Sequence, residues 1–120
     1  MRNILIILLV SISVSGCYYD HADLVYPQAT CSLTNVTYSS SVVSILSANC
    51  YSCHSGSAVN GGGIKLDSYT SLKTYQSNGQ LMNSINHTGG IAVMPLNGSK
   101  LSACEINTIQ TWITNGTPNN

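Results

Sequence analysis

The apolar positions that follow the first residues recur mainly at helical spacing, and no stretch makes a convincing strand. Four apolar side chains within residues 42–46 predict a helix over residues 40–49, and the serines that precede it can cap its start. Shorter helices are predicted over residues 68–76 and around residues 81–86. Residues 55–63 end in three glycines, so this stretch is predicted to be flexible turn structure.

The last helix has the clearest signals at both of its ends. Ser102 and Glu105 form a capping box, in which each side chain satisfies a backbone N–H of the other residue. Isoleucines then recur on one face as far as Ile113, and Asn115-Gly116 is a typical C-terminal stop. With no convincing strand and no internal repeat, the chain is expected to be a small all-α protein.

The first residues read as a targeting segment rather than as part of the fold. Arg2 is followed by an apolar run too short to span a bilayer and then by Val-Ser-Gly-Cys, which ends at Cys17. This pattern predicts a lipoprotein signal peptide over 1–16 with lipidation of Cys17, although an ordinary signal peptide with an incidental cysteine is an alternative. The predicted organisation continues with a lipidated tether over 17–37 and a folded domain over 38–120.

The charge of the chain excludes some function classes. Four lysine and arginine residues balance four aspartate and glutamate residues, so the formal net charge is +0. No basic patch for nucleic acid is present, and strong electrostatic steering of a partner is not expected. The carboxylates are scattered, and no paired acid and base suggests hydrolytic catalysis.

The most specific motif is Cys50-Tyr-Ser-Cys53-His54, the C-x-x-C-H signature of c-type heme attachment. Two thiols at this spacing can each form a thioether with one vinyl group of the same porphyrin. The histidine that follows can then be the proximal ligand of the iron. Zinc binding is an alternative, but the second ligand pair of a zinc finger is missing.

A second axial ligand would have to face His54 across the iron. Met94 is the leading candidate, because Pro95 and the neighbouring glycines predict an extended loop that can present its side chain. His87 is a rival, since imidazole binds heme iron readily, and Met82 is a weaker one. An open sixth position is the remaining alternative.

Two further cysteines, Cys31 and Cys104, are not needed for heme or lipid. Secretion would place them in an oxidising compartment, where a disulfide persists. We therefore expect a Cys31–Cys104 disulfide, and two unpaired buried thiols are the alternative.

Taken together, the C-x-x-C-H motif, Met94-Pro95 and the closing Trp112-Ile-Thr-Asn-Gly116 resemble a monohaem class I cytochrome c. The resemblance implies that an N-terminal and a C-terminal helix cross beside a covalently bound heme c. Cys50, Cys53, His54 and Met94 would hold the cofactor, with Trp112 near the porphyrin edge. Apolar side chains around it would raise the reduction potential, namely Ile91, Val93, Leu96, Ile106 and Ile109.

Members of this family carry electrons, so the resemblance implies a one-electron carrier rather than an enzyme. A heme-based sensor or a peroxidase-like enzyme with a labile sixth position is the alternative function. The expected location is outside the cytoplasm, on the periplasmic face of a membrane or on the cell surface. The expected partners are redox proteins of a respiratory chain or an oxidoreductase, and no nucleic acid is expected.

Overall fold

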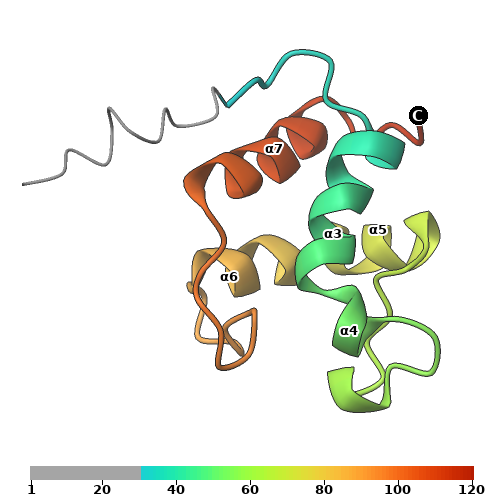
Figure 1. Ribbon diagram of the computed structural model, residues 1–120, viewed down its shortest axis with the longest axis vertical. Coiled ribbons are helices and arrows are strands. Elements are labelled where there is room, and N and C mark those ends of the chain that lie inside the picture. Colours follow the sequence, from blue (N-terminus) through green and yellow to red (C-terminus); the bar gives the residue numbers. More distant parts are fainter. Residues whose placement is uncertain (1–30) are drawn as a thin grey trace, which may run out of the picture. The chain divides into compact units, whose positions relative to one another are not determined.

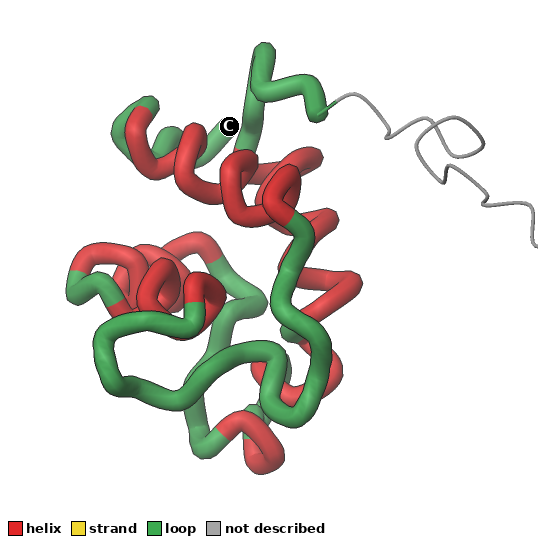
Figure 2. Tube along the Cα trace, turned by 90° about the vertical axis from the view of Figure 1, so that its left-hand side faces the viewer, coloured by secondary structure: helices red, strands yellow, loops and turns green. Residues whose placement is uncertain are grey.

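The computed structural model describes residues 31–120, and all regular structure within them is helical (Figures 1 and 2). The all-α prediction is therefore confirmed for this part of the chain. Residues 32–120 form one compact unit. Its segments, in chain order, are η1 (Tyr38–Val42), α3 (Val43–Asn49), α4 (Tyr51–His54), η2 (Val59–Gly61), α5 (Tyr69–Ser77), α6 (Gln80–Asn86) and α7 (Ala103–Thr114).

The first helix begins two residues earlier than predicted, because η1 and α3 together run from Tyr38 to Asn49. Its first turn is a π-helical turn whose N-cap is Thr37 rather than a serine. The last residue of the chain supplies two further acceptors: Tyr38 donates its backbone N–H to Asn120 Oδ1 (2.9 Å) and Ser39 to the Asn120 carbonyl (2.8 Å). A partner so distant in the sequence gives no local signal, which is why the early start was missed.

The other predicted helices are confirmed, with ends shifted by at most one residue. In α7 the capping box is formed: the Glu105 N–H donates to Ser102 Oγ at 3.2 Å, and the Ser102 N–H donates to Glu105 Oε2 at 2.9 Å. The glycine-rich stretch differs from the prediction, because it contains the short 3-10 helix η2. Ala58 before η2 and Gly62 after it both adopt left-handed backbone conformations.

The core lies where η1 and α7 pack against each other, and Figure 1 shows α7 running beside the start of the first helix. Trp112, on α7, is fully buried and packs beside the rings of Tyr38 and Tyr69. The expected contact between the first and last helices is therefore present. The buried core comprises Val36, Tyr38, Val42, Leu46, Leu66, Leu72, Leu81, Ile85, Leu101, Ile109 and Trp112.

Cys31 and Cys104 are joined by a disulfide, as predicted. The predicted signal peptide (1–16), the lipidation site Cys17 and most of the predicted tether lie outside the described residues. Within residues 31–120, no helix combines the length and the apolar character needed to cross a membrane.

Candidate heme pocket

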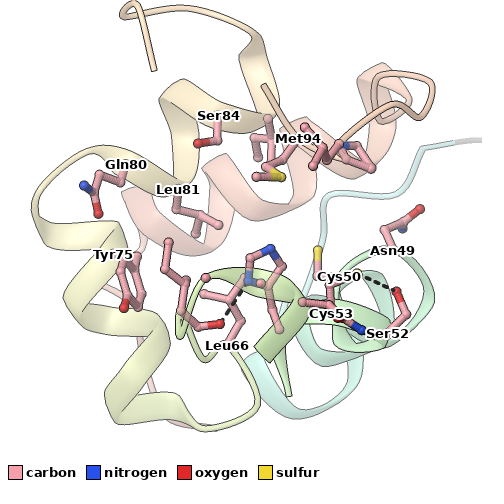
Figure 3. Close-up of a pocket in the computed structure, with 18 of the residues that line it drawn as sticks. Asn49, Cys50, Ser52, Cys53, Leu66, Tyr75, Gln80, Leu81, Ser84 and Met94 are labelled. Atoms are coloured by element: carbon pink, nitrogen blue, oxygen red, sulfur yellow. Dashed lines mark hydrogen bonds between the residues drawn. The ribbon is translucent and has the colours of Figure 1, made fainter. Parts of the chain in front are cut away.

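A cavity of about 400 Å³ opens among α4, η2, α6 and the loop that precedes α7 (Figure 3). Its volume is in the range of ligand-binding pockets. Among residues 31–120, no lysine, arginine, aspartate or glutamate lines it. The lining residues are Asn49, Cys50, Ser52, Cys53, His54, Asn60, Gly61, Gly62, Ile64, Leu66, Tyr75, Gln80, Leu81, Ser84, Ile85, Met94, Pro95, Leu96 and Leu101.

Both cysteines of the C-x-x-C-H motif are free thiols at this pocket. Cys50 joins α3 to α4, since its N–H donates to the Leu46 carbonyl (2.8 Å) and its carbonyl accepts from the His54 N–H (2.9 Å). The two thiols differ in exposure: Cys50 is half-buried, whereas Cys53 is exposed. Burial, and to a smaller extent the nearby carboxylate of Glu105, raises the pKa of the Cys50 thiol to about 11.

His54 is buried, with 8% of its surface exposed, and its ring orientation is fixed by a hydrogen bond. Its Nδ1 lies 2.9 Å from the Ile64 carbonyl oxygen. Because a carbonyl only accepts, Nδ1 carries the proton in this bond, and Nε2 keeps a lone pair for a metal. The backbone is also held, since the Leu66 N–H donates to the His54 carbonyl at 2.8 Å.

Gly61 packs directly against the imidazole of His54. A Cβ atom at position 61 would lie 2.5 Å from His54 Nδ1 and 2.6 Å from the Cys53 carbonyl oxygen. Only a glycine therefore allows η2 to approach the ring this closely. Sequence reasoning missed this role and treated the glycine run as a flexible turn. The only available signal was the run of three glycines soon after the motif.

Met94 is the only one of the three candidate sixth ligands that lines the pocket. It lies on the loop between α6 and α7, and the Met94–Pro95 peptide bond is cis. Figure 3 shows it on the wall opposite Cys50 and Cys53. Met82 instead packs against the core. His87 is exposed, and its Nε2 lies 3.0 Å from the Met94 carbonyl oxygen.

Several apolar residues expected around the cofactor do not surround this pocket. Ile91 and Val93 are 37% and 43% exposed and are not among its lining residues, while Leu96 lines the pocket but is 65% exposed. Ile109 is buried in the core instead of at the pocket.

Trp112 does not line the pocket either. Its ring nitrogen donates to the Pro118 carbonyl oxygen at 2.9 Å, and its ring packs with two tyrosines. The aromatic cluster therefore belongs to the contact between the first and last helices.

No group of three histidine, cysteine, aspartate or glutamate side chains within residues 31–120 is arranged to hold a metal ion. Comparisons with protein-family models, with curated proteins and with solved structures gave no match.

Proposed function

We propose that this chain is a monohaem c-type cytochrome that carries single electrons while tethered to a membrane. The observation that carries the proposal is the meeting of two separate sequence features in one cavity. Cys50, Cys53 and His54 come from one motif, Met94 comes from a loop far along the chain, and all four line the same uncharged pocket.

The residues present fit a covalently attached heme. Cys50, the N-cap of α4, and Cys53, within α4, are free thiols that are available for one thioether bond each. His54 keeps its Nε2 lone pair because Nδ1 carries the ring proton and donates a hydrogen bond to the Ile64 carbonyl, an arrangement common for histidines that bind metals. Met94 would supply the other axial ligand, a neutral thioether sulfur.

The bound iron would supply the ferric–ferrous couple, and the chain would set its reduction potential. A soft thioether ligand stabilises ferrous iron and so raises the potential relative to two histidine ligands. The pocket walls would act in the same direction, since the described residues that line them include no carboxylate to stabilise the additional positive charge of ferric heme.

The same reasoning suggests how the protein would meet its redox partners. Lipid at Cys17 would hold it on a membrane outside the cytoplasm, because several acyl chains bind far more firmly than one. With a formal net charge of +0, docking would rely on apolar and neutral polar contacts with proteins of a respiratory chain or an oxidoreductase.

Absorption spectra of protein made in cells with c-type heme maturation test the proposal. We expect low-spin heme in both redox states and a weak far-red sulfur-to-iron band in the ferric form. Low-spin heme without that band would argue against Met94 and favour His87 as the ligand. A high-spin spectrum that shifts on adding carbon monoxide would favour a sensor or a peroxidase-like enzyme, and a colourless protein would refute the proposal.

Replacing Met94 by alanine should abolish the far-red band and lower the reduction potential. Met82→Ala is the matched control, because Met82 also contacts apolar neighbours but lies outside the pocket lining. That variant should lose stability yet keep the band. An unchanged spectrum and potential in Met94→Ala would rule out Met94 as a ligand.

A further inference from the structure

His87 ends α6 in a backbone conformation that is unusual for its residue type. It is the C-cap, with a φ of 60° and a ψ of 45°. Left-handed residues at helix ends are usually glycine or asparagine, because a Cβ atom is disfavoured there. The sequence contains glycines two and three positions later, but histidine occupies the position that would suit glycine best. A histidine in this disfavoured backbone conformation suggests that its side chain has a structural or functional role.

The imidazole of His87 contacts the backbone of Met94. Its Nε2 lies 3.0 Å from the Met94 carbonyl oxygen, which can only accept, so His87 is the donor. On the other side of the same residue, the Met94 N–H donates to the Ser84 carbonyl oxygen at 3.1 Å. Both backbone polar groups of Met94 are therefore bonded to the C-terminal turn of α6.

Burial does little to hold the loop that carries Met94. Ile91 and Val93, its apolar residues before Met94, are 37% and 43% exposed. Pro95, which follows Met94, has no backbone N–H to donate. The two hydrogen bonds to the end of α6 are thus the main restraints on the Met94 backbone. Of these two, only the bond from His87 is made by a side chain.

We propose that His87 is a positioning residue that holds Met94 in place over the pocket. The consequence for iron ligation rests on the proposed function, whereas the restraint on the Met94 backbone does not. His87 would act through the carbonyl of Met94 without touching the cofactor. The rival role weighed for His87, as the iron ligand itself, would require its imidazole to leave this bond.

The test uses substitutions that separate the side chain from the backbone conformation. His87→Asn keeps a residue that tolerates a positive φ, but its amide is too short to reach the Met94 carbonyl. His87→Gln places its amide nitrogen about where Nε2 lies and should restore the bond. Asn97→Gly is the matched control, since Asn97 is also left-handed (φ 58°) on the same loop but has no described contact with Met94.

Amide hydrogen exchange at Met94 is the first measurement, made on the protein as isolated. We expect His87→Asn to speed exchange at Met94 by about fivefold, the effect of losing one ordinary hydrogen bond. Exchange at Trp112 in α7 should not change, and His87→Gln and Asn97→Gly should resemble the unmodified protein. Equal exchange at Met94 in His87→Asn and the unmodified protein would overturn the proposal, as would an equal acceleration in Asn97→Gly.

Competition by imidazole for the sixth position of the iron is the second measurement. His87→Asn should bind imidazole about fivefold more tightly, because the competing ligand displaces a less restrained Met94. Unchanged imidazole affinity would contradict the role in ligation. If the isolated protein carried no heme, the proposed cytochrome function would fail, but the exchange rates at Met94 would still decide the role of His87.

Discussion

The two walls of the pocket are built in opposite ways. On one wall, His54 is buried, its Nδ1 is bonded to the Ile64 carbonyl, and Gly61 packs against its ring. On the other wall, Met94 lies on a loop whose neighbouring apolar side chains are largely exposed, and hydrogen bonds to the end of α6 hold its backbone. The wall that carries His54, here called the histidine wall, is held by close packing. The wall that carries Met94, the methionine wall, is held mainly by hydrogen bonds to the Met94 backbone.

This difference has a consequence for ligand exchange. Packed regions open only when much of the structure opens, while a loop held by a few exposed hydrogen bonds opens at low free-energy cost. In the proposed cytochrome, His54 would therefore be a permanent ligand of the iron and Met94 an exchangeable one. The four predictions that follow test this contrast.

The largest effect should come from removing the disulfide, which lies at neither wall. It closes a loop of about 70 residues, so replacing Cys31 and Cys104 by serine should lower the free energy of unfolding by about 4 kcal/mol. Denaturant titration measures this loss. Because the change acts mainly on the unfolded chain, the far-red band of the folded protein should persist. Loss of that band would show that the methionine wall depends on the disulfide, and the contrast would then need revision.

Replacing one glycine by alanine at each wall compares how closely the two walls are packed. In Gly61→Ala the new Cβ atom would lie 2.5 Å from His54 Nδ1, so the free energy of unfolding should fall by about 2 kcal/mol. In Gly98→Ala the nearest atom is the Cβ of Pro95 at 3.2 Å, and the loop can yield, so the change should stay within about 0.5 kcal/mol. Equal losses in denaturant titrations of the two variants would contradict the contrast.

Thiol reactivity tests how closed the histidine wall is in the heme-free protein. A thiol reacts as its thiolate, and burial raises the pKa of Cys50 from 9.0 to about 11. In a Cys53→Ser protein at pH 8, alkylation of Cys50 should be at least about tenfold slower than in the same protein unfolded by urea. The rate should keep rising until the pH passes about 11. Equal rates with and without urea would mean that this wall is not formed without heme.

Of the four predictions, the smallest effect is expected from replacing Glu105. This residue of α7 is hydrogen-bonded to the side chain of Asn49, which lines the pocket next to Cys50. Its Oε1 accepts from the Asn49 side chain (3.0 Å), and its Oε2 accepts from the Ser102 N–H (2.9 Å). Glu105→Gln should lower the free energy of unfolding by about 1 kcal/mol near pH 7 and leave imidazole binding at the iron unchanged. A weakened Met94 bond in this variant would show that the walls are coupled.

The pH dependence of that loss follows from the pKa of Glu105. Burial alone would raise this pKa, but the hydrogen bonds from Ser102 and Asn49 outweigh it and leave the pKa below its ordinary value of 4.5. The carboxylate therefore contributes stability above pH 4.5, and that contribution is lost as the pH falls through the lowered pKa. The gap between the two proteins should narrow in acid, as denaturant titrations at several pH values would show.

The sequence predicted the parts of the fold that depend on local signals. The capping box at Ser102 and the stop after residue 77 are short-range features, and both helices appear where they were expected. The disulfide followed from the small number of cysteines. The choice of Met94 over His87 and Met82 rested on Pro95 and the glycines around it, and the structure places only Met94 at the pocket.

The sequence could not predict contacts between residues that are far apart along the chain. Nothing near Gly61 indicates that His54 will lie against it, and nothing near Tyr38 indicates that Asn120 will accept its N–H. The expectation that Ile91 and Val93 would surround the cofactor was also wrong, because apolar character favours burial but does not say which element a side chain will pack against.

The contacts of the last residues impose an order on folding during synthesis. The first turn of η1 donates two N–H groups to Asn120, the Tyr69 hydroxyl donates to the Thr117 carbonyl (2.7 Å), and Trp112 to Pro118. A chain emerges from the ribosome, or from an export channel, N-terminus first. The first turn of the helix that leads to Cys50 therefore cannot make its hydrogen bonds to Asn120 until residues 117–120 have emerged. Cys50 and Cys53 emerge earlier than these residues, so an enzyme that acts on their thiols would meet them before the contacts with residues 117–120 form.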